Sequence, residues 1–160
     1  MAVKFTIDKH ATAFPTKVLA RNGGMHIYNI LLDKDMDNGT FVGRGDFVDI
    51  DEYKAGAVPT GFELTVRTQM ENGEWYVELT KAPTDGELIF IYQKPVIAED
   101  YDSRFKDEAN FYNAKGDVVR GYALALGDAV LISEAGFDGT PAANAKITAV
   151  SANGKAKIGA

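Results

Sequence analysis

Two runs of alternating apolar and polar residues lie on either side of an Asn-Gly pair in the first half of the chain. Residues 62–67 read Phe-Glu-Leu-Thr-Val-Arg, and residues 75–80 read Trp-Tyr-Val-Glu-Leu-Thr. A period of two places every apolar side chain on one face of an extended strand. Asn72-Gly73 is a favoured two-residue hairpin turn. The sequence therefore predicts a β-hairpin with one buried face, which requires a second apolar layer to cover it.

The rest of the chain has the same rhythm of short apolar runs between turn residues. We expect further strands at Met25–Leu32, Thr40–Val42, Phe47–Ile50, Leu88–Tyr92, Val118–Leu126, Ala129–Ile132, and in a last hairpin over residues 146–158. Leu88–Tyr92 is continuously apolar, which is typical of a strand covered on both faces. Residues 51–55 and 99–110 are the candidates for at most two short helices. The predicted fold class is mainly β, an antiparallel barrel or sandwich of short strands.

The length of 160 residues fits one domain. Residues 1–24 contain Pro15 and Asn22-Gly23-Gly24 and show only a brief alternating run, Val3 to Ile7, so we expect an N-terminal arm with one strand. Residues 25–160 are then the β domain. A division into two small lobes, 25–95 and 110–160, is the alternative, because Pro95 and a charged stretch interrupt the apolar pattern there.

Composition excludes several functions. The chain has no cysteine, so it forms no disulfide, thiolate nucleophile or cysteine-based zinc site, and it suits assembly in a reducing cytosol. The net charge of −6, with no basic stripe, argues against a nucleic-acid partner. No apolar run approaches the length of a membrane span, and the N-terminus lacks a signal-peptide pattern, so we expect no membrane association.

Candidates for catalysis are scarce. His10 and His26 are the only histidines. One lies in the predicted arm and the other in an apolar strand, so a structural or surface role is favoured for both. No nucleophile elbow, phosphate-binding loop or dinucleotide fingerprint is present. We therefore predict that the protein is not an enzyme and has no cofactor.

A candidate calcium site lies in the turn Asp33–Gly39, where Asp33, Asp35 and Asp37 alternate as in a calcium-binding loop. Such a loop needs glycine at its sixth position and a bidentate glutamate at its twelfth. Here these positions hold Asn38 and Arg44. A polar turn is therefore the favoured interpretation, and calcium binding stays open as the alternative.

Two other features suggest binding to a partner. Arg44-Gly45-Asp46 matches the integrin-binding triplet, but glycines at this spacing are more typical of a bulge or tight bend in a strand. Trp75 and Tyr76 place an aromatic ring on each face of one strand. Exposed aromatic rings can bind a partner or a sugar, so a carbohydrate-binding β-sandwich is one alternative function.

The second half of the chain resembles a known group of proteins. The resemblance rests on residues 86–92 (Gly-Glu-Leu-Ile-Phe-Ile-Tyr), 111–122 (beginning Phe-Tyr-Asn-Ala-Lys-Gly-Asp), 126–128 (Leu-Gly-Asp) and 132–139 (Ile-Ser-Glu-Ala-Gly-Phe-Asp-Gly). These are similar to small head decoration proteins, which stabilise the capsid in tailed bacteriophages of Gram-positive bacteria. Residues 1–60 carry no such resemblance.

The resemblance implies a β-rich virion protein without catalytic residues, located on the capsid surface. Its partners would be the major capsid protein and neighbouring copies of itself. A different phage component, such as a tail tube, head fibre or baseplate part, is the alternative. We expect the arm, residues 1–24, and the Asp33–Gly39 turn to reach the neighbours.

Overall fold

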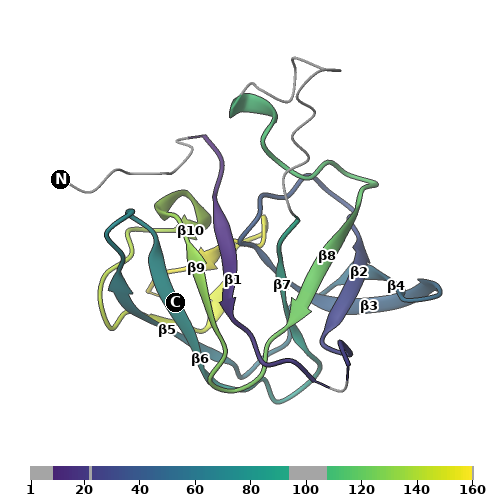
Figure 1. Ribbon diagram of the computed structural model, residues 1–160, viewed down its shortest axis with the longest axis horizontal. Coiled ribbons are helices and arrows are strands. Elements are labelled where there is room, and N and C mark those ends of the chain that lie inside the picture. The colour runs from purple at the N-terminus through teal and green to yellow at the C-terminus, as the bar shows by residue number, and fades with distance from the viewer. Residues whose placement is uncertain (1–8, 22, 94–107, 160) are drawn as a thin grey trace.

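The computed structural model describes residues 9–21, 23–93 and 108–159. The protein is mainly β, and its strands form a small closed barrel beside a second sheet system, which confirms the predicted fold class (Figure 1). Within these ranges, helical structure is limited to two 3-10 turns, η2 (Glu108–Asn110) and η3 (Glu134–Gly136). No helix in this part of the chain is long and apolar enough to cross a membrane.

Five strands close the barrel, in the order β2-β4-β3-β7-β8. Their bounds are β2 Ile27–Leu31, β3 Phe41–Asp49, β4 Glu52–Gly56, β7 Leu88–Ile91 and β8 Val118–Ala123. The pairs are antiparallel except for β2 and β4, which run parallel. The β3–β4 hairpin forms one extremity of the molecule, at the right of Figure 1.

A five-stranded antiparallel sheet lies beside the barrel, in the order β1-β9-β6-β5-β11. Its strands are β1 Ala13–Lys17, β9 Ala129–Ile132, β6 Trp75–Lys81, β5 Glu63–Gln69 and β11 Lys146–Ile147. A small sheet of two-residue strands completes the fold: β10 Phe137–Asp138, β13 Ala156–Lys157 and β12 Ala149–Val150.

Strand β7 joins the two hydrophobic cores. Leu88 and Phe90 pack in the larger core, together with residues of the five-stranded sheet such as Leu64. Ile89 and Ile91 point the other way, into the core of the barrel. Each face of β7 therefore covers a different core, which is why all four side chains are buried and why the sequence here is continuously apolar.

The predicted arm is partly incorporated into the sheet. Residues 13–17 form β1, which pairs with β9 at the edge of the five-stranded sheet, and Ala13 lies opposite Ile132. The predicted strand at Val3 to Ile7 lies outside the described residues. The alternative division into lobes 25–95 and 110–160 does not match the sheets, because each large sheet contains strands from both segments.

Three local predictions were wrong in detail. Residues 51–55, expected to form a helical turn, lie largely in strand β4 (Glu52–Gly56), which completes the barrel between β2 and β3. The hairpin around Asn72-Gly73 exists, but its loop spans residues 70–74, since Gln69 pairs with Trp75. Residues 41–49 form one strand with irregular register instead of two short ones. The predicted helix over 99–110 is represented in the described part by η2 alone.

Candidate functional site

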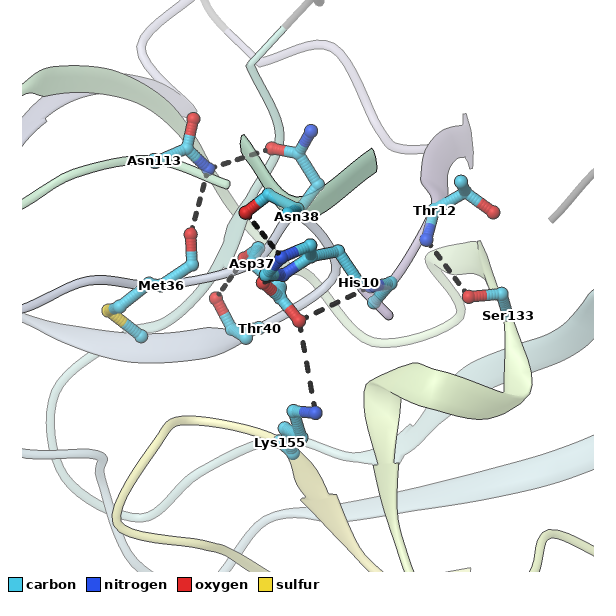
Figure 2. A network of polar contacts seen from close by, with 11 residues as sticks. His10, Thr12, Met36, Asp37, Asn38, Thr40, Asn113, Ser133 and Lys155 are labelled. Atoms are coloured by element: carbon cyan, nitrogen blue, oxygen red, sulfur yellow. Dashed lines mark hydrogen bonds and ion pairs between the residues drawn. The ribbon is translucent and has the colours of Figure 1, made fainter. Parts of the chain in front are cut away.

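A junction of polar side chains gathers around Asp37, between the barrel and the five-stranded sheet (Figure 2). The Asp37 side chain is 11% exposed, and its Oδ1 lies 2.8 Å from Nδ1 of His10. Its Oδ2 accepts a hydrogen bond of 3.2 Å from the Ala11 amide and lies 3.8 Å from Nζ of Lys155. One carboxylate thus joins the N-terminal segment, the turn after β2 and the C-terminal segment.

His10 is bound at both ring nitrogens. Nδ1 faces the Asp37 carboxylate, and Nε2 lies 3.2 Å from the carbonyl oxygen of Ala109. Both of these neighbours are acceptors, and each lies within hydrogen-bond distance of a ring nitrogen. The histidine is therefore placed to hold segments together.

A second part of the junction is built from amides. Asn38 exchanges hydrogen bonds with the backbone of Gln93, donating to the carbonyl over 3.1 Å and accepting from the amide over 3.0 Å. Nδ2 of Asn113 donates to Oδ1 of Asn38 and to the carbonyl of Met36. Both asparagines are 8% exposed. Buried amides need such partners, and these bonds fix the turn after β2 against residue 113.

The structure does not bring the three carboxylates of the candidate calcium site together. Asp33 is exposed, Asp35 accepts a hydrogen bond from the Lys115 amide over 2.8 Å, and Asp37 binds His10 and Ala11. Across residues 9–21, 23–93 and 108–159, no group of three or more His, Cys, Asp or Glu side chains is placed to hold a metal ion. The turn has the geometry of a structural connection.

An open hollow of about 310 Å³ lies beside the junction. Its lining includes Lys9, His10, Tyr112, Asn153 and Lys155. His10 and Lys155 both contact Asp37, which also lines the hollow together with Asp35. Its charges are of both signs, so the hollow offers no concentrated field for a charged ligand.

Glu74 is a buried carboxyl group beside the N-terminal segment. It is 1% exposed and accepts hydrogen bonds from the Thr12 hydroxyl over 3.2 Å and from Nδ2 of Asn72 over 3.1 Å. Burial raises the pKa of Glu74 above its usual value, against the opposing effect of these bonds. Its ionised form is therefore disfavoured in the folded protein.

Replacing Glu74 with glutamine should stabilise the protein at neutral pH. A carboxyl group whose pKa is raised on folding costs stability above its unfolded pKa, and this cost disappears when it is protonated in both states. Glutamine is neutral and can still bond Thr12 and Asn72. Urea unfolding of the wild-type protein and E74Q should show the advantage of the variant at pH 7 and its loss near pH 4. An equal difference at both pH values would contradict this account.

The tip of the β3–β4 hairpin, residues 46–51, is the most exposed apolar feature of the barrel. Ile50 is 82% exposed, Phe47 63% and Val48 41%. Asp46, Asp49 and Asp51 are exposed beside them. Single exposed apolar residues are ordinary, but a group of three on a projecting turn is typical of a protein contact. We call these six residues the hairpin tip.

The hairpin tip lies next to a group of side chains from β2, β3, β4 and the residue before β7, which we call the hairpin base: Tyr28, Arg44, Tyr53 and Glu87. The Arg44 guanidinium lies 5.6 Å from the ring centre of Tyr28 and 5.4 Å from that of Tyr53, and it forms an ion pair of 3.3 Å with Glu87. Phe47 of the tip meets the Tyr53 ring edge to face, with centres 5.8 Å apart. These contacts hold the tip in one orientation.

The Tyr28 hydroxyl belongs to the same group. It donates a hydrogen bond of 3.0 Å to Glu87 and accepts one of 3.3 Å from Arg44. Burial first, and then the Glu87 carboxylate, raise the pKa of the Tyr28 phenol above its usual value. The hydroxyl therefore stays protonated and keeps its donor role in the hairpin base.

The other residues singled out in the sequence are part of the strands and the interior of the fold. The Arg44-Gly45-Asp46 triplet lies within β3, where the register is irregular, so the predicted bulge is confirmed. Trp75 packs partly buried against the larger core, and Tyr76 is also half-buried on the interior strand β6. Neither ring is an exposed platform. His26 is buried, and its Nδ1 lies 3.3 Å from the Arg21 amide.

Sequence reasoning missed the hairpin base and the role of Glu74. The base combines residues 28, 44, 53 and 87, which lie far apart in the sequence, so no local sequence pattern indicates it. The one available signal was the placement of Phe47, Val48 and Ile50 among aspartates, which does not alternate as a half-buried strand should. No family model, curated protein or solved structure matches this chain.

Proposed function

We propose that this chain is a structural protein of a tailed-bacteriophage virion, a decoration protein that binds the major capsid protein on the outside of the head and stabilises it. It would assemble in the bacterial cytoplasm and reside on the capsid surface, beside other copies of itself. The family is suggested by the sequence resemblance of residues 86–139. The observation that carries a binding role is the exposed apolar hairpin tip.

The hairpin tip supports attachment to another protein because its apolar side chains lie outside both cores of this chain. Phe47, Val48 and Ile50 belong to neither core cluster. Burying exposed side chains of this size against a partner contributes about 25 cal/mol for each Å² removed from water. Phe47 already packs against Tyr53 of the hairpin base, so this side chain loses less conformational entropy on binding.

Purified protein should sediment with phage heads made from the major capsid protein encoded by the same phage. Heads assembled without this chain are mixed with it and centrifuged through sucrose, and both fractions are examined on gels. We expect saturable binding at many copies per head, and decorated heads that resist heating better than bare ones. Protein that remains entirely unbound would refute the proposal.

The copy number separates the proposed role from other virion roles. A decoration protein binds at every equivalent position on the shell, whereas a baseplate or head-fibre component occurs at few positions per particle. Quantitative staining of purified virions measures this directly. A few copies per virion would replace the decoration role with one of these, and co-purification with tails alone would indicate a tail component.

A further inference from the structure

The hairpin tip combines apolar side chains with a local excess of negative charge. Asp46, Asp49 and Asp51 surround Phe47 and Ile50, and all five are exposed. The cations nearest in sequence are Arg44 and Lys54, and Arg44 is bound to Glu87 in the hairpin base. A surface that buries the apolar residues must therefore also neutralise the aspartates, since desolvated unpaired charges are costly.

We infer that the hairpin tip inserts into an apolar cleft of a different protein, and that lysine or arginine side chains border this cleft. This inference rests on the proposed attachment to a shell and specifies the element that attaches. Phe47 and Ile50 would fill the cleft. The aspartates would pair with the bordering cations at its rim, where opposite charges set orientation and association rate.

A second copy of this chain does not fit that description. Its most basic segment is residues 141–160, which contain three lysines and no acidic residue. Lys146 is already paired with Glu63, and Lys155 with Asp37. The segment therefore has few free cations to offer an acidic tip, and two chains of net charge −6 repel each other.

The experiment compares three variants with the wild-type protein in binding to heads. F47S/I50S removes the apolar side chains, and D46N/D49N/D51N removes the charge. Asn is suited to position 51, where φ is 60°, because it tolerates left-handed backbone. The matched control is L126S, since Leu126 is 65% exposed, like Phe47, but lies in the turn between β8 and β9.

We expect F47S/I50S to weaken binding about 100-fold or more, as loss of central apolar anchors does. The triple Asn variant should weaken it about tenfold at low salt and flatten its salt dependence, because exposed charges act mainly through screened attraction. L126S should bind like the wild type. Circular dichroism spectra should be unchanged in all three variants. The melting temperature should fall slightly in F47S/I50S alone, because this variant loses the Phe47–Tyr53 ring contact.

Each outcome decides one of the two proposals. If the wild-type protein does not bind heads, the proposed function fails, whatever the variants do. If the wild type binds and F47S/I50S binds equally well, the function stands and the hairpin tip is not its docking element. If the Asn variant binds more tightly than the wild type, the inference that cations border the cleft is wrong. If sedimentation velocity shows self-association that F47S/I50S abolishes, the partner is a second copy and the assignment to a different protein is overturned.

Discussion

Replacing Gly43 with alanine should lower the free energy of unfolding by about 3 kcal/mol or more. A Cβ atom at this position would lie 1.8 Å from the carbonyl oxygen of Ala57 and 2.8 Å from its carbonyl carbon. These are backbone atoms, so no side-chain rotation relieves the clash. Gly43 pairs with Gly56 on one side and Leu88 on the other, so any shift disturbs three barrel strands.

Gly116→Ala is the matched control for Gly43→Ala. Gly116 has a φ of 89° and nothing near its missing Cβ, so alanine there costs only the left-handed backbone, about 1 kcal/mol. Urea unfolding followed by tryptophan fluorescence compares the two variants, because Trp75 is partly buried against the larger core. Similar losses in both would show that the close approach of β3 to residue 57 is not what requires glycine.

Replacing Asp37 with alanine should cost about 2–4 kcal/mol, because it removes three contacts to buried or partly buried groups. The variant loses the 2.8 Å contact with His10, the hydrogen bond from the Ala11 amide and the ion pair with Lys155. Asp37→Asn keeps one acceptor oxygen and should lose less. Thermal unfolding measures the total loss of stability in each variant. Hydrogen exchange adds a local test, since the Ala11 amide should lose protection in the alanine variant.

Asp35→Ala controls for the loss of a carboxylate from the same turn. Asp35 is exposed and accepts one hydrogen bond, from the Lys115 amide, so its removal should cost about 1 kcal/mol or less. Equal effects at positions 35 and 37 would mean that the turn responds to charge in general. The junction at Asp37 would then not be a specific connection between segments.

The parts of the fold that could be predicted are those that depend on the pattern of residues adjacent in the sequence. Strict alternation over residues 62–67 and 75–80 placed β5 and β6 correctly, and the uninterrupted apolar run Leu88–Tyr92 indicated a strand covered on both faces. In each case one or two residues of spacing determine which way a side chain points. These elements could be assigned before any partner strand was known.

The barrel closure and the candidate sites depend on residues far apart in the chain. His10 meets Asp37 across 27 positions, and Asn38 meets Asn113 across 75. The parallel pairing of β2 with β4 makes residues 52–56 a strand, although a helical turn was predicted over residues 51–55. The hairpin base similarly needs three strands in register before Arg44 can lie between two tyrosines. Tertiary context overrides local preference in all of these.

The interleaving of strands also governs how the protein is made. Ala13 and Phe14 of β1 pair with Ile132 and Leu131 of β9. Strand β1 therefore cannot pair until β9 has been synthesised. On the ribosome, a nascent chain that ends after β7 has an open barrel and an unpaired β1, because both β8 and β9 are still missing. The pairings among β2, β3, β4 and β7 and the hairpin β5–β6 involve only strands that are already made at that stage. Both large sheets are therefore complete only after residues 118–157 have emerged from the ribosome.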